Sequence, residues 1–195
     1  MREVFKIFFA SVSLVACSFT VAHAQEDTYV SFSSGVGLFD LSDADKELKG
    51  DLEDDTGSTA TVNSDESAFI ARAAIGTKES DNFSVEIGFF ASSELDTEFN
   101  TKLGFNRTIS SFAHGFDLVG KYHLANSNMA FKAGLHRSKI EMSSGGFEAS
   151  HTGTGLLFGG EVDVSKDTFI GYDYYQDVGG ESDGSFSFFY FGKRF

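Results

Sequence analysis

The chain has 195 residues, a net charge of −14, 23 Phe, 21 Gly, one Cys, no Pro and no Trp. This length suits one domain, and an aromatic content of 15% argues against a disordered chain. The acidic balance excludes a typical nucleic-acid binder, which needs a basic face, and one cysteine excludes an intramolecular disulfide framework or a cysteine-based zinc cluster.

Residues 1–24 have the pattern of a secretory signal peptide. A basic start and an apolar stretch precede the motif Ala22-His23-Ala24, which matches a small-residue cleavage site. Cleavage there leaves one mature domain, residues 25–195, without cysteine, which suits an oxidising compartment. A lipobox-like sequence ending at Cys17 leaves lipidation of a retained Cys17 as an alternative, and an uncleaved anchor is a third.

Eight later segments alternate between apolar residues and small or polar ones. In the first, Val30, Phe32 and Val36 are apolar, whereas Ser31 and Gly35 are not. A period of two predicts strands with one apolar face. In chain order the segments are 28–39, 69–76, 83–89, 112–122, 129–136, 156–164, 170–174 and 189–195. The alternation is interrupted by Ile70, Val119, Leu157, Phe186 and Phe188.

The connections between these segments differ in length in a regular way. Short polar links fall at 77–82, 125–128 and 165–167, and long ones at 40–67, 90–111, 141–151 and 176–184. Short turns at one end and long loops at the other are typical of outer-membrane barrels. The sequence therefore predicts an all-β fold, an eight-stranded antiparallel up-and-down transmembrane β-barrel with short periplasmic turns and long external loops. A soluble lipocalin-like barrel, with the apolar face inside, is the alternative.

The polar faces carry many glycines and nearly balanced charges. Glycine marks crowding or bends in strands, and the interior of a narrow barrel is filled by side chains. Because a buried charge is tolerated only when it is paired, we expect a structural charge network in the lumen. Its members are Arg72, Glu86, Asp117, Lys121, Lys132, Glu161, Asp163, Asp173 and Arg194. A gated ion path or a small-ligand site are the other interpretations.

The apolar faces form a band of Phe, Leu, Val, Ile and Ala that would contact lipid. Tyrosines near the segment ends are expected to form an aromatic girdle at the headgroups. They are Tyr29, Tyr122, Tyr172, Tyr174 and Tyr175. Lys193 falls on the apolar face two residues before the end of the chain, so we expect it at the membrane interface.

Several short stretches resemble the OmpA/OmpX-like eight-stranded outer-membrane β-barrel family. They are Tyr29–Ser31, Asp81–Phe89, Gly155–Val162, Gly171–Tyr175 and Phe191–Phe195. The resemblance implies a barrel in the outer membrane of a diderm bacterium. It also implies that the aromatic last strand, with Phe189, Phe191 and Phe195, is the assembly signal read by the barrel-insertion machinery. It implies no single function, since such barrels are structural, adhesive, complement-resisting or enzymatic.

Two features of the sequence are candidate sites. His136 and Ser138, followed by Glu141 and Glu148, resemble the His-Ser-Glu arrangement of lipid A deacylases, but the alternation turns His136 and Ser138 to the lumen. The segment 40–66 holds ten carboxylates and two lysines; this is a solvated loop or a place for divalent cations, without EF-hand spacing. No catalytic residues, metal ligands or cofactor motifs are predicted.

These observations predict a monomeric, non-enzymatic outer-membrane barrel that supports the envelope and presents acidic loops. Its expected partners are outer-membrane lipid, lipopolysaccharide and the insertion machinery. The alternatives are a surface adhesin acting through the loops, a lipid A-modifying enzyme and a soluble lipocalin-like binder.

Overall fold

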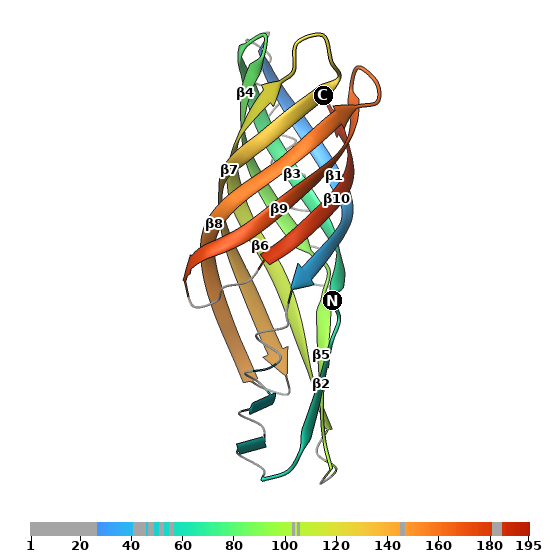
Figure 1. Ribbon diagram of the computed structural model, residues 1–195, viewed down its shortest axis with the longest axis vertical. Coiled ribbons are helices and arrows are strands. Elements are labelled where there is room, and N and C mark those ends of the chain that lie inside the picture. Colours follow the sequence, from blue (N-terminus) through green and yellow to red (C-terminus); the bar gives the residue numbers. More distant parts are fainter. Residues whose placement is uncertain are drawn as a thin grey trace.

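The computed structural model describes residues 27–40, 46, 49–50, 53–54, 57–102, 104, 106–144, 147–180 and 185–195. The predicted signal peptide and Cys17 lie outside these residues. The described residues form ten strands (Figure 1): β1 (Thr28–Asp40), β2 (Ala60–Ser64), β3 (Ser67–Ser80), β4 (Phe83–Ser92), β5 (Leu95–Thr101), β6 (Asn106–His123), β7 (Met129–Ser144), β8 (Phe147–Asp163), β9 (Thr168–Gly180) and β10 (Ser185–Arg194).

Eight of the strands close into a ring. The sheet order is β2-β5-β6-β4-β3-β1-β10-β9-β8-β7, and an additional β6–β7 pairing joins its two sides. Each pairing is antiparallel, and β1 lies between β3 and β10, so that the first and last barrel strands meet. Closure leaves no free edge in the barrel wall, as a structure in lipid requires. The predicted closed, antiparallel eight-stranded β-barrel is confirmed.

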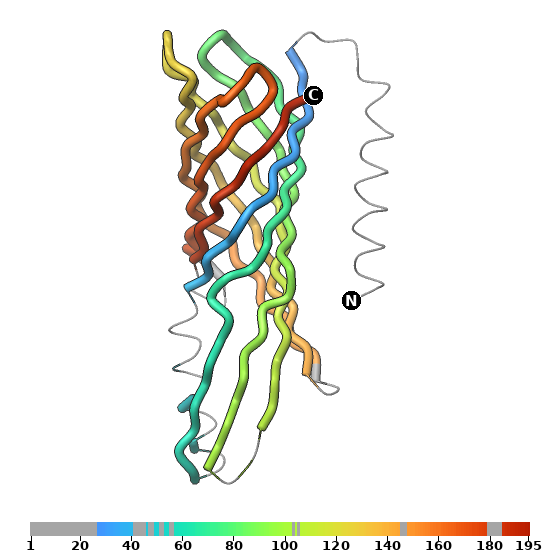
Figure 2. The backbone as a smooth tube through the Cα atoms, turned by 90° about the vertical axis from the view of Figure 1, so that its right-hand side faces the viewer, coloured from blue at the N-terminus to red at the C-terminus, as the bar shows by residue number. Residues whose placement is uncertain are grey.

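One end of the barrel has short turns, and the other carries a projecting sheet. Asp81–Asn82 joins β3 to β4, and 124–128 joins β6 to β7. At the opposite end β2 and β5 continue β3 and β4 beyond the ring and pair alongside the start of β6. Figure 2 shows this projection and the separate tip of β7 and β8, which diverges from it.

The expected long loops at 90–111 and 141–151 are wrong in part, because strands occupy most of both segments. In β5, Leu95, Thr97 and Phe99 are buried while Asp96 and Glu98 are exposed. The period of two is the same as in the barrel, but the polar residues here lie on the outer face. Ala91 lies opposite His114 and Leu95 opposite Ser111, so the segment around Ser93 and Glu94 has one residue more than the facing part of β6. This extra residue is a β-bulge.

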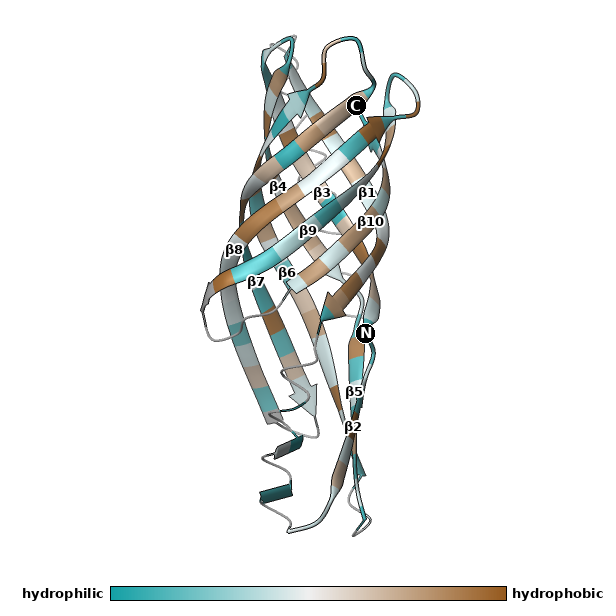
Figure 3. Cartoon of the chain, in the orientation of Figure 1, coloured by the Kyte–Doolittle hydropathy of each residue, from teal (hydrophilic) through white to brown (hydrophobic). Residues whose placement is uncertain are grey.

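The outer face of the ring is apolar. Ile87, Phe116 and Phe131 have exposed fractions of 61%, 60% and 57%, and hydrophobic positions alternate with hydrophilic ones along the barrel strands (Figure 3). Monomeric soluble proteins rarely expose so large an apolar surface. The arrangement is the reverse of a lipocalin-like barrel, so that alternative is wrong. Among the described residues, no helix has the length and apolarity needed to cross a membrane.

The predicted tyrosine girdle needs correction. Tyr122 and Tyr172 are exposed on the outer face, but Tyr175 is completely buried in the lumen. Tyr29 also points inward, where its hydroxyl donates a hydrogen bond to Glu86 at 3.0 Å. Adjacent residues of a strand face opposite sides, so Tyr174 and Tyr175 cannot both contact the headgroups.

Candidate functional site

The lumen contains a buried network of ion pairs. Arg72 on β3 binds Asp117 on β6 with two hydrogen bonds, Nε to Oδ2 at 2.8 Å and Nη2 to Oδ1 at 2.6 Å. Its Nη1 atom also donates to Glu86 on β4 at 3.1 Å. The side chains of Arg72, Glu86 and Asp117 are at most 4% exposed. A buried bidentate pair is a strong, geometrically specific contact.

The two buried lysines extend the network across further strands. Lys121 on β6 lies 2.6 Å from Glu86 Oε1 and 2.9 Å from Glu161 Oε2 on β8. Lys132 on β7 pairs with Asp173 on β9. The Tyr190 hydroxyl on β10 accepts from Lys132 at 3.0 Å and donates to Asp173 at 3.1 Å.

Near the short turns the network reaches the rim of the barrel. Arg194 on β10 pairs with Glu161 and, at 2.6 Å from Nη1 to Oδ1, with Asp163 at the end of β8. Asp163 is only half-buried. The structure thus brings all nine predicted lumen residues to the inner face and places each in an ion pair within the set.

Glycines on the inner face make room for these large side chains. A Cβ atom at Gly88 would lie 2.6 Å from Arg72 Nη2 and 2.5 Å from Asp117 Oδ1. A Cβ atom at Gly171 would collide with the Tyr190 ring. Real Cβ contacts are essentially never this short. Glycine is therefore needed where a bulky side chain from a neighbouring strand lies over that position in the lumen.

Aromatic side chains fill the lumen between the charge network and the projecting sheet. Phe186 stacks on Tyr175 with ring centroids 4.3 Å apart and on Phe39 at 5.1 Å. Phe90 lies against Phe186 and Tyr175 at 5.5 Å and 5.2 Å. We call Phe39, Phe90, Tyr175 and Phe186 the aromatic plug. The lumen is therefore layered, and the nine-residue charge network does not extend beyond the plug.

The sequence interpretation missed this plug, although a signal was present. Ile70, Val119, Leu157, Phe186 and Phe188 interrupt the predicted alternation, and all five belong to the buried cluster inside the barrel. A large apolar residue on the polar face of a lumen strand marks apolar filling of the interior.

His136 and Ser138 lie inside the barrel and not on its lipid-facing wall. Ser138 donates to Asp177 Oδ1 at 3.3 Å, and His136 Nε2 lies 3.6 Å from the same oxygen. The carboxylate therefore stands between the hydroxyl and the imidazole. In a Ser-His-Asp triad the imidazole must contact the serine itself, so this order lacks an activated nucleophile.

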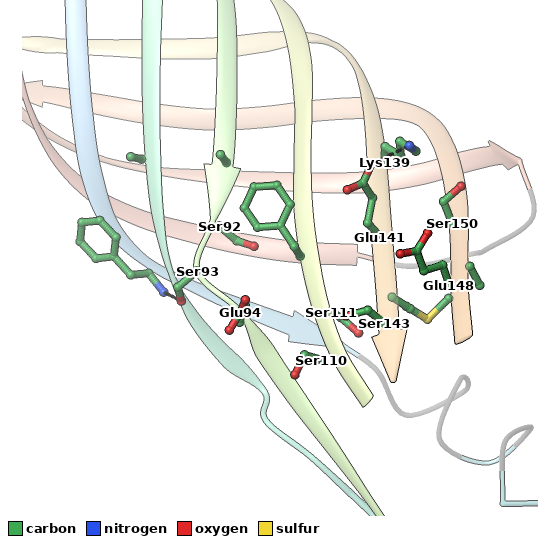
Figure 4. A pocket seen from close by; sticks show the side chains of 16 residues that line it. Ser92, Ser93, Glu94, Ser110, Ser111, Lys139, Glu141, Ser143, Glu148 and Ser150 are labelled. Atoms are coloured by element: carbon green, nitrogen blue, oxygen red, sulfur yellow. Dashed lines mark hydrogen bonds and ion pairs between the residues drawn. The ribbon is translucent and has the colours of Figure 1, made fainter. Parts of the chain in front are cut away.

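A groove of about 840 Å³ lies on the outer face where the barrel meets the projecting sheet (Figure 4). Phe69, Ala71 and Phe112 line its barrel side, and mostly polar residues between Ala91 and Ser150 line the remainder. Lys139 donates to Glu141 at 2.6 Å within it. The hydrogen bond from Lys139 holds the pKa of Glu141 below its ordinary value.

The remaining predicted features are the phenylalanines of the last strand, the acidic segment 40–66 and the absence of a metal site. Phe189, Phe191 and Phe195 are exposed on the outer face of the last strand and after it. Much of the acidic segment 40–66 lies outside the described residues. Within the part of the chain that the structure describes, no group of three or more His, Cys, Asp or Glu side chains is placed to hold a metal ion.

Comparison with solved structures shows which known barrels have this architecture. The outer membrane protein OprG from Pseudomonas aeruginosa matches with a TM-score of 0.52 and 13% identity, over 87% of this chain and 96% of that one. Neisserial surface protein A matches with a TM-score of 0.48 and 13% identity, over 86% and 95%. Ail from Yersinia pestis, in complex with the heparin analogue sucrose octasulfate, matches with a TM-score of 0.46 and 14% identity, over 87% and 99%.

No protein-family model matches the sequence, and no curated protein matches it. The closed ring, the apolar outer wall and the likeness to OprG define the class of protein. The chain has the fold of an OmpA/OmpX-like eight-stranded outer-membrane β-barrel, with a charged network buried in its lumen.

Proposed function

We propose that the protein is a non-enzymatic outer-membrane barrel that supports the envelope and presents its projecting sheet to the surroundings. The observation that carries this proposal is the filled lumen. Arg72, Lys121 and Lys132 are tied to carboxylates, and the aromatic plug closes the space beyond them. A lumen packed in this way conducts little, so any contact with the surroundings is made by the outside of the molecule.

Two measurements test this proposal. The outer-membrane fraction is run in detergent gels with and without boiling, and the folded barrel is expected to shift in mobility only after heating. The purified barrel is then added to planar lipid bilayers, where we expect no stable channel events. A chain found in the soluble fraction would contradict the location, and steady ion conductance would contradict the closed lumen.

A surface adhesin or host-contact protein is the second candidate, and the projecting sheet favours it. Its outer face carries the exposed Asp96 and Glu98, and the exposed Glu148, on the separate tip of β7 and β8, lines the 840 Å³ groove. Such a face would suit a cationic partner surface. A variant with Glu98→Gln and Glu148→Gln is expected to reduce attachment to host cells while the heat-dependent gel shift is retained. Unchanged attachment would contradict this second function.

The geometry does not favour a lipid A-modifying enzyme. His136 and Ser138 face the lumen, whereas a lipid substrate reaches the outer wall. A Ser138→Ala variant is therefore expected to leave the lipid A acyl pattern of the cell unchanged, and a changed acyl pattern would contradict our proposal.

A further inference from the structure

Lys193 is a cation on the outer wall of the barrel. On β10 it projects outward between the exposed Phe191 and Phe195, while its neighbours Gly192 and Arg194 face the lumen. Register pairs it with Thr168, the first residue of β9, so it lies near the rim that carries the short turns. This rim is the periplasmic side of an outer-membrane barrel.

Within the described part of the chain, no carboxylate pairs with Lys193. Its Nζ atom lies 4.9 Å from the centre of the Phe195 ring. The buried lysines Lys121 and Lys132, in contrast, are each within an ion pair. A cation at the edge of a low-dielectric layer favours an anion nearby. The described residues supply none, so an anion from the surroundings can fill this role.

A groove of about 330 Å³ in the outer wall begins beside Lys193. Register places Phe32 opposite Lys193 and Ser34 opposite Phe191. Across β1 and β3, Ser34 pairs with Ala71 and Phe32 with Ala73. The small side chains of Ser34, Ala71 and Ala73 form the floor of the groove. The rings of Phe32, Phe89 and Phe191 border it.

We propose that Lys193 and this groove bind one anionic glycerophospholipid of the periplasmic leaflet. The phosphate pairs with the Lys193 ammonium group, and one acyl chain lies over Ala71 and Ala73 between the phenylalanine rings. The charge of Lys193 selects an anionic headgroup, because a zwitterionic lipid brings its own cation. The groove extends from Lys193 toward the middle of the wall, which is the direction an acyl chain takes from the interface.

The proposal is tested with the full chain folded into nanodiscs that contain phosphatidylcholine and a minor fraction of phosphatidylglycerol. Native mass spectrometry of the released protein counts the phospholipids that remain bound. We expect the wild type to retain phosphatidylglycerol about fivefold in excess of its share, the order expected for one basic residue at a membrane surface. Lys193→Gln should abolish this excess, and Lys193→Arg should keep it.

Two further variants separate the groove from charge alone. Ala71→Phe fills the floor without changing any charge, and we expect it to reduce retention of phosphatidylglycerol. Lys139→Gln removes an outward-facing lysine that is already paired with Glu141, and it should leave retention unchanged. Equal retention by the wild type and Lys193→Gln, or full retention by Ala71→Phe, would overturn the proposal.

This inference assumes that the barrel spans a membrane, as proposed above. A chain that does not enter the bilayer fails the heat-dependent gel shift before any lipid is counted. The two failures are therefore distinguishable. Lys193 lies on the outer wall away from the lumen network, so Lys193→Gln should fold even where Ala71→Phe does not.

Discussion

Removal of Arg72 tests whether the ion pairs hold the barrel together. In Arg72→Met, the Asp117 carboxylate loses both guanidinium hydrogen bonds and, among the described residues, keeps only the Tyr175 hydroxyl, at 3.4 Å. Glu86 is less affected, since it retains Lys121 at 2.6 Å and the Tyr29 hydroxyl at 3.0 Å. Leaving one buried charge unpaired costs about 3–5 kcal/mol. For a urea dependence of about 2 kcal/mol/M, the unfolding midpoint should fall by about 2 M.

The assay is urea unfolding of the folded barrel in lipid vesicles, followed by the fraction that keeps the unboiled gel mobility. The double variant Arg72→Met/Asp117→Leu removes both charges and should recover most of the loss, because the stranded carboxylate is gone. Lys139→Met is the matched control: its pair with Glu141 is exposed, so the change should stay within about 0.5 kcal/mol. A midpoint for Arg72→Met equal to that of Lys139→Met, or additive losses in the double variant, would refute the reasoning.

Three other predictions follow from the packing. Phe186→Ala removes the central ring of the aromatic plug, so it should cost about 3–5 kcal/mol and raise conductance in planar bilayers; silent bilayers would argue against the plug as a seal. Gly88→Ala should lower the refolded fraction because its Cβ meets Arg72 and Asp117, whereas Gly120→Ala, with nothing nearer than 3.3 Å, should refold normally. In Lys139→Gln, carboxyl NMR titration should show the pKa of Glu141 rising toward its ordinary value. In the wild type, this pair is therefore lost as pH falls through the lowered pKa.

The fold could be predicted from the sequence because a barrel wall in lipid enforces a strict period of two. Val30 and Phe32 face outward and Ser31 faces inward, as the alternation in the sequence predicts. The projecting strands were harder to predict, because their outer faces contact water. In β5 the alternation is carried by Leu95 and Phe99 against Asp96 and Glu98, a weaker signal than a run of phenylalanines.

Membership of the lumen network could be predicted, whereas its pairing could not. Charge on the inner face is visible in the sequence, but Arg72 and Asp117 are 45 residues apart. Their contact spans the intervening strand β4 and depends on the space left by Gly88. The predicted girdle position of Tyr175 is wrong, because adjacent residues of a strand face opposite sides. The outward position of Tyr174 already implied an inward Tyr175.

The lumen network and the projecting sheet have different roles in the structure. Seven barrel strands, from β3 to β10, each contribute at least one of the nine charged residues, and β1 contributes the Tyr29 hydroxyl. Pairs such as Lys121–Glu161 and Lys132–Asp173 skip the strand between them, so they connect strands that backbone hydrogen bonds do not join. They therefore stabilise the closed ring rather than any single hairpin. The outer face of the projecting sheet takes no part in these pairs, and its exposed residues are free to serve contact with the surroundings.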